Sequence, residues 1–157
     1  MYKIGDRVVY PMHGAGVIEA IEEKEILGSI QKYYVMKMPV GDMKVMIPME
    51  TCDEIGIRSV IDGKEAEKVL KDFSGYEIEE AQSWNKRYRE NMMRIKSGDV
   101  YEVAHVVKML ISRDRAKGLS TGERKMLSNA KQILISELVL AKNAKQSEVE
   151  TIIEELV

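Results

Sequence analysis

The hydrophobic pattern of this 157-residue chain changes near residue 60, and that change limits the possible folds more than any other feature. Before it, short runs of β-branched and aromatic residues are separated by glycine and proline. After it, apolar residues recur every three or four positions. The first pattern is typical of strands with tight turns and the second of amphipathic helices. We therefore predict an α+β protein with a β module at 1–58, a helical domain at 62–157, and a linker at 56–63 or 73–78.

The β module is predicted to be small and strongly curved. Strands are expected at Arg7–Tyr10, Val17–Ile26, Tyr33–Met38 and Lys44–Ile47. Turns are expected at His13–Gly16, Gly28–Ser29 and Gly41–Asp42. Glycines between short strands favour a bent antiparallel sheet, which indicates a Tudor-like or SH3-like barrel. The Lys44–Ile47 strand is a candidate edge to which a partner strand could add.

The second part is predicted to be an all-helical bundle of four or five helices. Helices are expected at Lys64–Phe73 and Glu79–Lys96. Three further helix starts carry a capping-box pattern, in which an N-cap oxygen is followed three residues later by glutamate. These patterns are Asp99/Glu102, Ser120/Glu123 and Ser147/Glu150.

Positive charge is concentrated in one block of the helical part. Residues 84–131 contain 12 basic and 5 acidic side chains, a net charge of +7, although the whole chain carries −2. A local basic field attracts polyanions even when the whole protein is acidic. Arg124 and Lys125 are informative because they lie in the first turn of a predicted helix, where positive charge opposes the helix dipole. This placement indicates an external anion such as the nucleic-acid backbone.

The only tryptophan, Trp84, lies at the start of this basic block. It belongs to an apolar stripe that begins at Ala81 and continues through Tyr88 and Met92, so one interpretation is a buried core anchor. The other interpretation is an exposed wedge beside DNA, which the basic neighbours Lys86, Arg87 and Arg89 would support. The spacing alone leaves both interpretations open.

The sequence contains no convincing catalytic or metal-binding constellation. His13 is interpreted as a turn residue and His105 as a mid-helix residue, and neither belongs to a Cys-x-x-Cys or similar ligand set. We therefore expect no enzymatic activity, no metal and no cofactor. Cys52 is the only cysteine, and neither a signal peptide nor a membrane-spanning run is recognisable, so we expect a cytoplasmic protein.

Several motifs resemble those of the CarD/CdnL family of bacterial transcription regulators. They are Gly5-Asp6-x-Val8-Val9-Tyr10-Pro11-x-His13-Gly14-x-Gly16, Trp84–Tyr88, Lys96–Asp99 and Gly118–Leu127. They occur in the family's order and extend over nearly the whole chain. The resemblance implies a Tudor-like domain that binds the β subunit of RNA polymerase, related to a domain of the transcription-repair coupling factor. It also implies a helical domain that contacts promoter DNA at the upstream edge of the melted bubble and stabilises the open complex.

The resemblance also implies roles for individual residues. Trp84 corresponds to the family's wedge in the minor groove. The basic positions that correspond to DNA-backbone contacts are Lys86, Arg87, Arg89 and Arg124, to which we add Lys125 on its charge. The polymerase contact corresponds to Lys24, Ile26, Val45, Met46 and Ile47. This chain has Met46 where well-known relatives carry arginine, and Lys24 where arginine is frequent.

These features together predict a monomeric regulator that binds polymerase with one part and promoter DNA with the other, without a membrane partner. The alternative is a protein–protein adaptor with a buried tryptophan and no direct role at DNA. Exposure of Trp84 separates the two.

Overall fold

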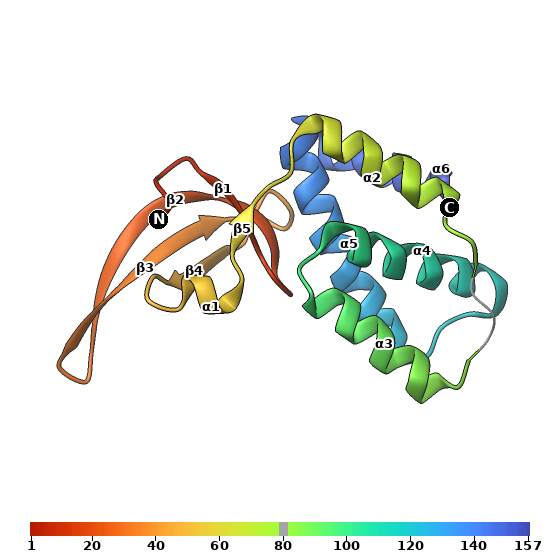
Figure 1. Ribbon diagram of the computed structural model, residues 1–157, viewed down its shortest axis with the longest axis horizontal. Coiled ribbons are helices and arrows are strands. Elements are labelled where there is room, and N and C mark those ends of the chain that lie inside the picture. Colours follow the sequence, from red (N-terminus) through yellow and green to blue (C-terminus); the bar gives the residue numbers. More distant parts are fainter. Residues whose placement is uncertain (79–81) are drawn as a thin grey trace.

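The computed structural model describes residues 1–78 and 82–157 and has two parts, a curved sheet followed by a helical bundle (Figure 1). The strands are β1 (Arg7–Tyr10), β2 (Gly14–Ile26), β3 (Ser29–Lys37), β4 (Lys44–Pro48) and β5 (Arg58–Ser59). A single helical turn, α1 (Cys52–Ile55), precedes β5. The predicted α+β class is confirmed, whereas α1 and β5 were not predicted.

The five strands form one antiparallel sheet in the order β4-β3-β2-β1-β5. The two outer strands, β4 and β5, each pair with a single neighbour, so the Tudor-like sheet is curved but not closed into a barrel. A register shift in β2 between Ile18 and Ala20 adds to the bend. Beyond this shift, β2 and β3 continue as a long two-stranded hairpin that extends away from the helices (Figure 1).

The prediction of a turn at His13–Gly16 is wrong in part, because Gly14 to Gly16 belong to β2. The chain turns earlier, at Pro11 to His13, and Gly14 pairs with Tyr10. Gly14 has a φ of +116°, and a Cβ there would also lie 2.8 Å from Oγ of Ser136, whereas Gly16 is needed only for close approach. A Cβ on Gly16 would lie 2.5 Å from the Met36 side chain and 2.7 Å from a carbonyl oxygen of β3. These residues therefore allow the sheet to fold closely upon itself.

The bundle contains five helices within the described residues. They are α2 (Gly63–Gly75), α3 (Trp84–Lys96), α4 (Val100–Lys117), α5 (Thr121–Lys142) and α6 (Gln146–Leu156). The sheet ends at Ser59 and α2 begins at Gly63, so the change of architecture falls within 56–63. α2 packs in the helical core through Val69, Leu70 and Phe73.

The helix starts follow the predicted caps at two of three positions. Asp99 caps α4 and Ser120 caps α5, and each accepts a backbone N–H of its first turn. The Ser147 prediction is wrong, because α6 begins at Gln146 and its N-cap position is Lys145, without a side-chain cap. The predicted helix start at Glu79 lies outside the described residues. The described helix α3 begins at Trp84, because Ser83 supplies the cap.

The buried hydrophobic residues form three clusters. The larger core joins all five bundle helices and includes Val107, Leu134 and Ile153. The smaller one fills the concavity of the sheet, with Ile18 and Met36 among its members. The opposite face of the sheet, at Val9 and Ala15, packs against Leu140 of α5. Helix α5 therefore belongs to the bundle and also packs against one face of the sheet.

Candidate functional site

Trp84 is the first residue of α3, and the residue is 43% exposed. It stacks on Tyr88 one turn later, with ring centroids 4.8 Å apart and an interplanar angle of 17°. Its Nε1–H donates a hydrogen bond to Oγ of Ser120 at 3.0 Å. The indole is therefore neither a buried core anchor nor a freely rotating side chain. The ring is partly exposed, and its orientation is fixed by the stack on Tyr88 and the hydrogen bond to Ser120.

These contacts bring together the first turns of α3 and α5. Ser120 is the N-cap of α5, where its Oγ also accepts from the backbone N–H of Glu123 at 3.2 Å. A Cβ on Gly122 would lie 3.5 Å from Cζ2 of Trp84 and 3.7 Å from Cε2 of Tyr88. These are ordinary van der Waals distances, so the stacked pair packs directly against the first turn of α5.

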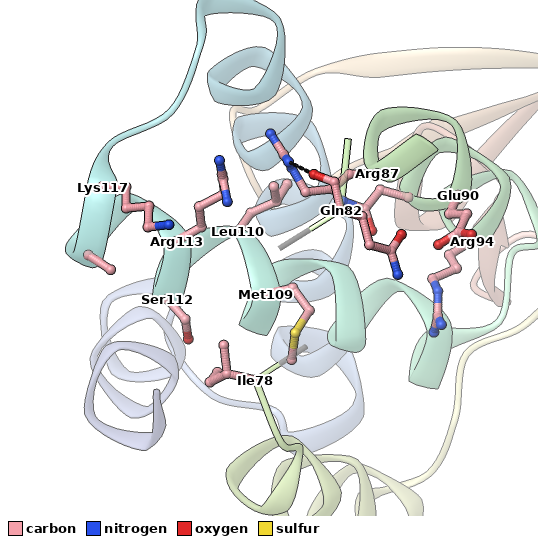
Figure 2. A pocket seen from close by; sticks show the side chains of 12 residues that line it. Ile78, Gln82, Arg87, Glu90, Arg94, Met109, Leu110, Ser112, Arg113 and Lys117 are labelled. Atoms are coloured by element: carbon pink, nitrogen blue, oxygen red, sulfur yellow. Dashed lines mark hydrogen bonds between the residues drawn. The ribbon is translucent and has the colours of Figure 1, made fainter. Parts of the chain in front are cut away.

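A buried ion pair holds the same two helices together behind the indole. Arg87 donates to Glu123 through Nε at 2.8 Å and through Nη2 at 3.0 Å, and the Glu123 side chain is 2% exposed. Arg87 also donates to the carbonyl oxygen of Gln82 (Figure 2). The hydrogen bond from Arg87 lowers the pKa of Glu123, and the same bond raises the pKa of Arg87. The guanidinium that was expected beside DNA is thus occupied inside the protein.

Four other basic side chains near Trp84 are exposed and form no ion pair with another described residue. They are Lys86, Arg89, Arg124 and Lys125. Arg124 is positioned by a bond from its Nε to the Leu119 carbonyl oxygen at 3.1 Å, which leaves the rest of its guanidinium open. Because these cations lie at or near the positive ends of two helices, the region around Trp84 has a strongly positive local field.

Other members of the basic block are neutralised within the protein. Arg115 and Lys131 both pair with Glu154 of α6, at 2.9 and 2.8 Å. Arg94 pairs with Glu102 at 3.1 Å. The net charge of the block therefore overstates the number of cations that are available to an external anion.

The residues expected to contact polymerase occupy two places on the sheet. Val45, Met46 and Ile47 lie on the outer strand β4, whereas Lys24 and Ile26 lie near the end of the β2–β3 hairpin. Lys24, Ile26 and Met46 are at least partly exposed, but the Ile47 side chain is fully buried in the smaller core. Ile47 can therefore offer a partner only its backbone.

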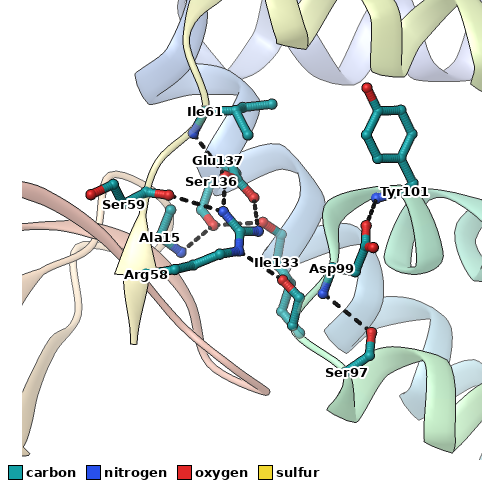
Figure 3. Close-up of polar contacts among 11 residues, drawn as sticks. Ala15, Arg58, Ser59, Ile61, Ser97, Asp99, Tyr101, Ile133, Ser136 and Glu137 are labelled. Carbon is teal, nitrogen blue, oxygen red and sulfur yellow. Dashed lines mark hydrogen bonds and ion pairs between the residues drawn. The ribbon is translucent and has the colours of Figure 1, made fainter. Parts of the chain in front are cut away.

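Polar contacts fix the sheet against α5 (Figure 3). Arg58 of β5 donates to both carboxylate oxygens of Glu137 at 2.7 Å, and its Nε donates to the Gly98 carbonyl oxygen at 2.9 Å. Glu137, which is 2% exposed, also accepts the backbone N–H of Ile61 at 3.1 Å. The Ala15 N–H donates to Oγ of Ser136 at 2.8 Å. These bonds join the strand region and the connecting segment to α5 and to the turn between α3 and α4, so they set the orientation of the two parts.

The two histidines lie where the sequence predicted them. His13 is in the turn before β2 and packs on Tyr10 with centroids 4.1 Å apart, and His105 is within α4 and contacts Tyr76. No group of three or more His, Cys, Asp or Glu side chains in the described residues is placed to share a metal ion. Within residues 1–78 and 82–157, no helix combines the length and apolar content that crossing a membrane requires.

Sequence reasoning missed the residues that position the predicted ones. The capping-box pattern identified Ser120 and Glu123 as a helix start, but it did not indicate that they hold Trp84 and Arg87. No local signal marked Arg58 and Glu137, which are 79 positions apart.

Comparison with known proteins agrees with this two-part arrangement. Residues 2–61 match the family described as the CarD-like/TRCF RID domain, and residues 68–154 match the CarD C-terminal domain. The chain is 42% identical over 151 residues to the Bacillus subtilis (strain 168) protein named "Putative transcription factor YdeB", an alignment that covers 96% of this chain and 99% of that protein. The chain therefore belongs to the CarD family of transcription regulators and carries both of the family's domains in order.

Proposed function

We propose that this protein binds the β subunit of RNA polymerase through its sheet and promoter DNA through its helical domain, and that it stabilises the open complex with Trp84 as a minor-groove wedge. The observation that carries the proposal is the state of Trp84. The residue is 43% exposed, and its indole is held by Tyr88 and Ser120 and is flanked by exposed cations. This exposure supports the wedge over the adaptor alternative, in which the tryptophan was expected to be buried.

The fixed indole suits insertion at a distorted base step. Unstacking a base step costs about a few kcal/mol, which backbone contacts must offset. A side chain already held by a stack and a hydrogen bond loses little conformational freedom on binding. At the upstream edge of the bubble the step is already partly opened, so the cost is smaller there than in intact duplex. Preference for this fork over intact duplex shifts closed complexes towards open ones.

The backbone contacts are assigned to Lys86, Arg89, Arg124 and Lys125, because these cations are exposed and form no ion pair with another described residue. Arg87 is given a positioning role instead. Its bidentate bond to Glu123 holds the first turn of α3 against α5 and thereby fixes the direction of the indole. Release of Arg87 to reach a phosphate would leave the Glu123 carboxylate buried without its partner, which is strongly unfavourable.

The polymerase contact is assigned to the outer edge of β4 and to the end of the β2–β3 hairpin. The edge offers backbone groups for strand addition, and Met46, Lys24 and Ile26 supply side chains. Met46 is paired with Val35 and Lys24 with Gln31, so the two places are four residues apart along β3. At about 3.3 Å per residue this separation is about 13 Å, which requires a broad partner surface.

The bonds between Arg58 and Glu137 fix the orientation of the sheet relative to the helical domain, and the proposed function uses this fixed orientation. A flexible tether would raise only the local concentration of the helical domain at DNA. With a fixed orientation, binding of the sheet to polymerase also directs Trp84 towards the DNA. This reduces the orientational entropy that is lost when the wedge inserts. Under this proposal the protein acts as a monomer in the cytoplasm, where it would meet transcribing polymerase.

The DNA half of the proposal is tested by comparing affinity for forked and fully paired promoter fragments. The wild-type protein should prefer the fork, and Trp84→Ala should lose that preference while retaining weak, salt-sensitive duplex binding. Met93→Ala is a matched control, because Met93 is an exposed apolar residue of the same helix. Equal fork preference in wild type and Trp84→Ala would reject the wedge.

The polymerase half is tested with the isolated β subunit. Ile26→Asp and Met46→Asp should each weaken binding, because they place a charge in an apolar contact, whereas Met93→Asp in the helical domain should not. Binding that survives both sheet substitutions and fails with Met93→Asp would instead favour the adaptor function, with the helices as the docking surface.

A further inference from the structure

Helix α6 carries four glutamates and neither lysine nor arginine between Gln146 and Leu156. One of these glutamates, Glu154, accepts hydrogen bonds from two cations of the basic block. Its Oε2 accepts from Arg115 of α4 at 2.9 Å, and its Oε1 accepts from Lys131 of α5 at 2.8 Å. The hydrogen bond from Lys131 lowers the pKa of Glu154, so the carboxylate is ionised at neutral pH. One acidic side chain thus neutralises two positive charges that come from two other helices.

The three side chains of this cluster are accessible to solvent. Those of Glu154, Arg115 and Lys131 are 46%, 49% and 31% exposed. Ion pairs with this exposure contribute little to folding stability, and an external anion can compete for their cations. Helix α6 is held in the bundle by other residues, because Val149 and Ile153 are buried in the larger core. The main consequence of the two ion pairs is therefore the loss of two positive charges from the surface.

Lys131 lies close to one of the proposed DNA contacts. Arg124 and Lys131 are seven residues apart on α5, which is nearly two turns, so they lie on the same side of the helix about 10 Å apart along its axis. Both line one open groove, which is also lined by Gln146 and Glu150 of α6. A single DNA strand carries one phosphate per 3.4 Å or so of helix axis, so this spacing spans about three phosphates. A DNA backbone that contacts Arg124 and continues along α5 would therefore reach Lys131 beside two glutamates of α6.

We propose that Glu154 restrains DNA binding, because it holds Arg115 and Lys131 in internal ion pairs and so withholds them from phosphate. This inference deepens the proposed function and rests on the DNA contact proposed above. A phosphate must break an internal ion pair to reach either cation, so both add little to the release of counterions from DNA. The helical domain then binds ordinary duplex weakly, and attachment of the sheet to polymerase supplies the effective concentration that binding at a promoter requires.

The test measures the affinity of the full chain for a fully paired promoter fragment at several salt concentrations. Glu154→Gln removes the negative charge and keeps the length of the side chain. The bond from Nη2 of Arg115 to the backbone carbonyl oxygen of residue 154, at 3.0 Å, remains and keeps this arginine in place. Release of two cations should make the slope of log affinity against log salt concentration steeper by about 0.9 for each cation, and should raise the affinity by about tenfold or more at low salt.

Glu155→Gln is the matched control. It removes the same charge from the next position of α6, but Glu155 is exposed and forms no ion pair with a described residue, so the slope should not change. Lys131→Gln should also leave the slope unchanged in the wild-type background, whereas in the Glu154→Gln background it should make the slope shallower by about 0.9. The inference is overturned if Glu154→Gln has the wild-type slope, or if Glu155→Gln makes the slope equally steep.

Failure of this inference is distinguishable from failure of the proposed function. If the wild-type protein binds DNA with the expected salt dependence and prefers the fork, but Glu154→Gln behaves identically, only the restraint by Glu154 is wrong. If neither protein binds the fragment in a salt-dependent way, the proposed DNA contact is wrong and the restraint is overturned with it. Melting curves check the fold of the variants, and Glu154→Gln should melt close to wild type because its ion pairs are half exposed.

Discussion

The Nε1–H of Trp84 and the Oγ of Ser120 are joined by a hydrogen bond of 3.0 Å, so one hydroxyl both caps α5 and holds the indole at the start of α3. Ser120→Ala should therefore have two effects. Loss of the cap should destabilise the protein by about 0.5–2 kcal/mol. Loss of the second bond should free the indole, which is measurable as lower fluorescence anisotropy and easier quenching of the only tryptophan.

The matched control for this prediction is Ser147→Ala. Ser147 resembles Ser120 in sequence, but it lies inside α6 and caps nothing. Ser147→Ala should leave both the free energy of unfolding and the tryptophan fluorescence anisotropy unchanged. If Ser120→Ala retains the wild-type anisotropy, Tyr88 alone positions the indole.

The Arg87–Glu123 pair predicts a particular dependence of stability on acidity. The hydrogen bond from Arg87 lowers the pKa of Glu123 in the folded state. Its contribution to the free energy of unfolding is therefore complete above the unfolded-state value of about 4.3 and is lost as pH falls through the lower, folded-state pKa. Glu123→Gln should be less stable than wild type near neutral pH, and the difference should shrink in acid.

Thermal unfolding measured from neutral pH down to a pH of about 3 tests whether the stability difference shrinks in acid. The exposed Glu25 of β2 offers a control, because it lies in no helix and forms no ion pair with another described residue, so Glu25→Gln should leave the dependence of stability on pH nearly unchanged. If the melting temperatures of Glu123→Gln and wild type differ by the same amount down to the lowest pH, the Arg87–Glu123 pair is not the source of the pH dependence.

The Arg58–Glu137 contact should determine how rigidly the sheet is attached to α5. Glu137→Ala leaves Arg58 without its bidentate acceptor and the Ile61 N–H without its acceptor. The free energy of unfolding should fall by about 3 kcal/mol, which is at the lower end for a buried pair because Arg58 is partly exposed. The Lys44–Glu19 pair is the comparison, and Lys44→Gln should cost much less than Glu137→Ala, because the Lys44 side chain is exposed and solvent screens its charge.

Urea unfolding measures these energies, and spin labels at Lys24→Cys and Lys125→Cys measure the orientation. The label-to-label distance distribution should be narrow in the otherwise wild-type protein and broad when Glu137 is replaced. A broad distribution in both proteins would show that the contact does not hold the two parts together.

Four exposed cations that form no ion pair with another described residue predict a modest salt dependence of DNA binding. If Lys86, Arg89, Arg124 and Lys125 each neutralise one phosphate, a plot of log affinity against log salt concentration should have a slope of about −4. Lys86→Gln should reduce the slope by about one, whereas Arg115→Gln should not, because Arg115 is paired with Glu154. An equal reduction by both substitutions would mean that the whole basic block faces DNA.

The comparison of sequence and structure shows where local patterns are informative. Strand β1 and the caps at Asp99 and Ser120 were predicted correctly, because they depend on neighbouring residues. The pair Gly14 and Gly16 was misread as a turn, because close approach to α5 and β3 has the same residue preference as a turn.

Contacts between distant residues could not be predicted in this way. The capping pattern located Glu123, but only the fold shows that its carboxylate accepts from Arg87, 36 residues earlier, and thereby removes a cation from the expected DNA contact. Exposure of Trp84 was equally undetermined, because a stripe with helical spacing describes both a core residue and a residue stacked at a helix start.

The central claim is that Trp84 stabilises the open complex after the protein is bound to polymerase. The most direct measurement is the lifetime of promoter open complexes after addition of a competitor, with wild type or Trp84→Ala at concentrations that saturate the polymerase. We expect equal occupancy of polymerase and a shorter open-complex lifetime with Trp84→Ala, close to the lifetime without the protein. An unchanged lifetime at equal occupancy would contradict it.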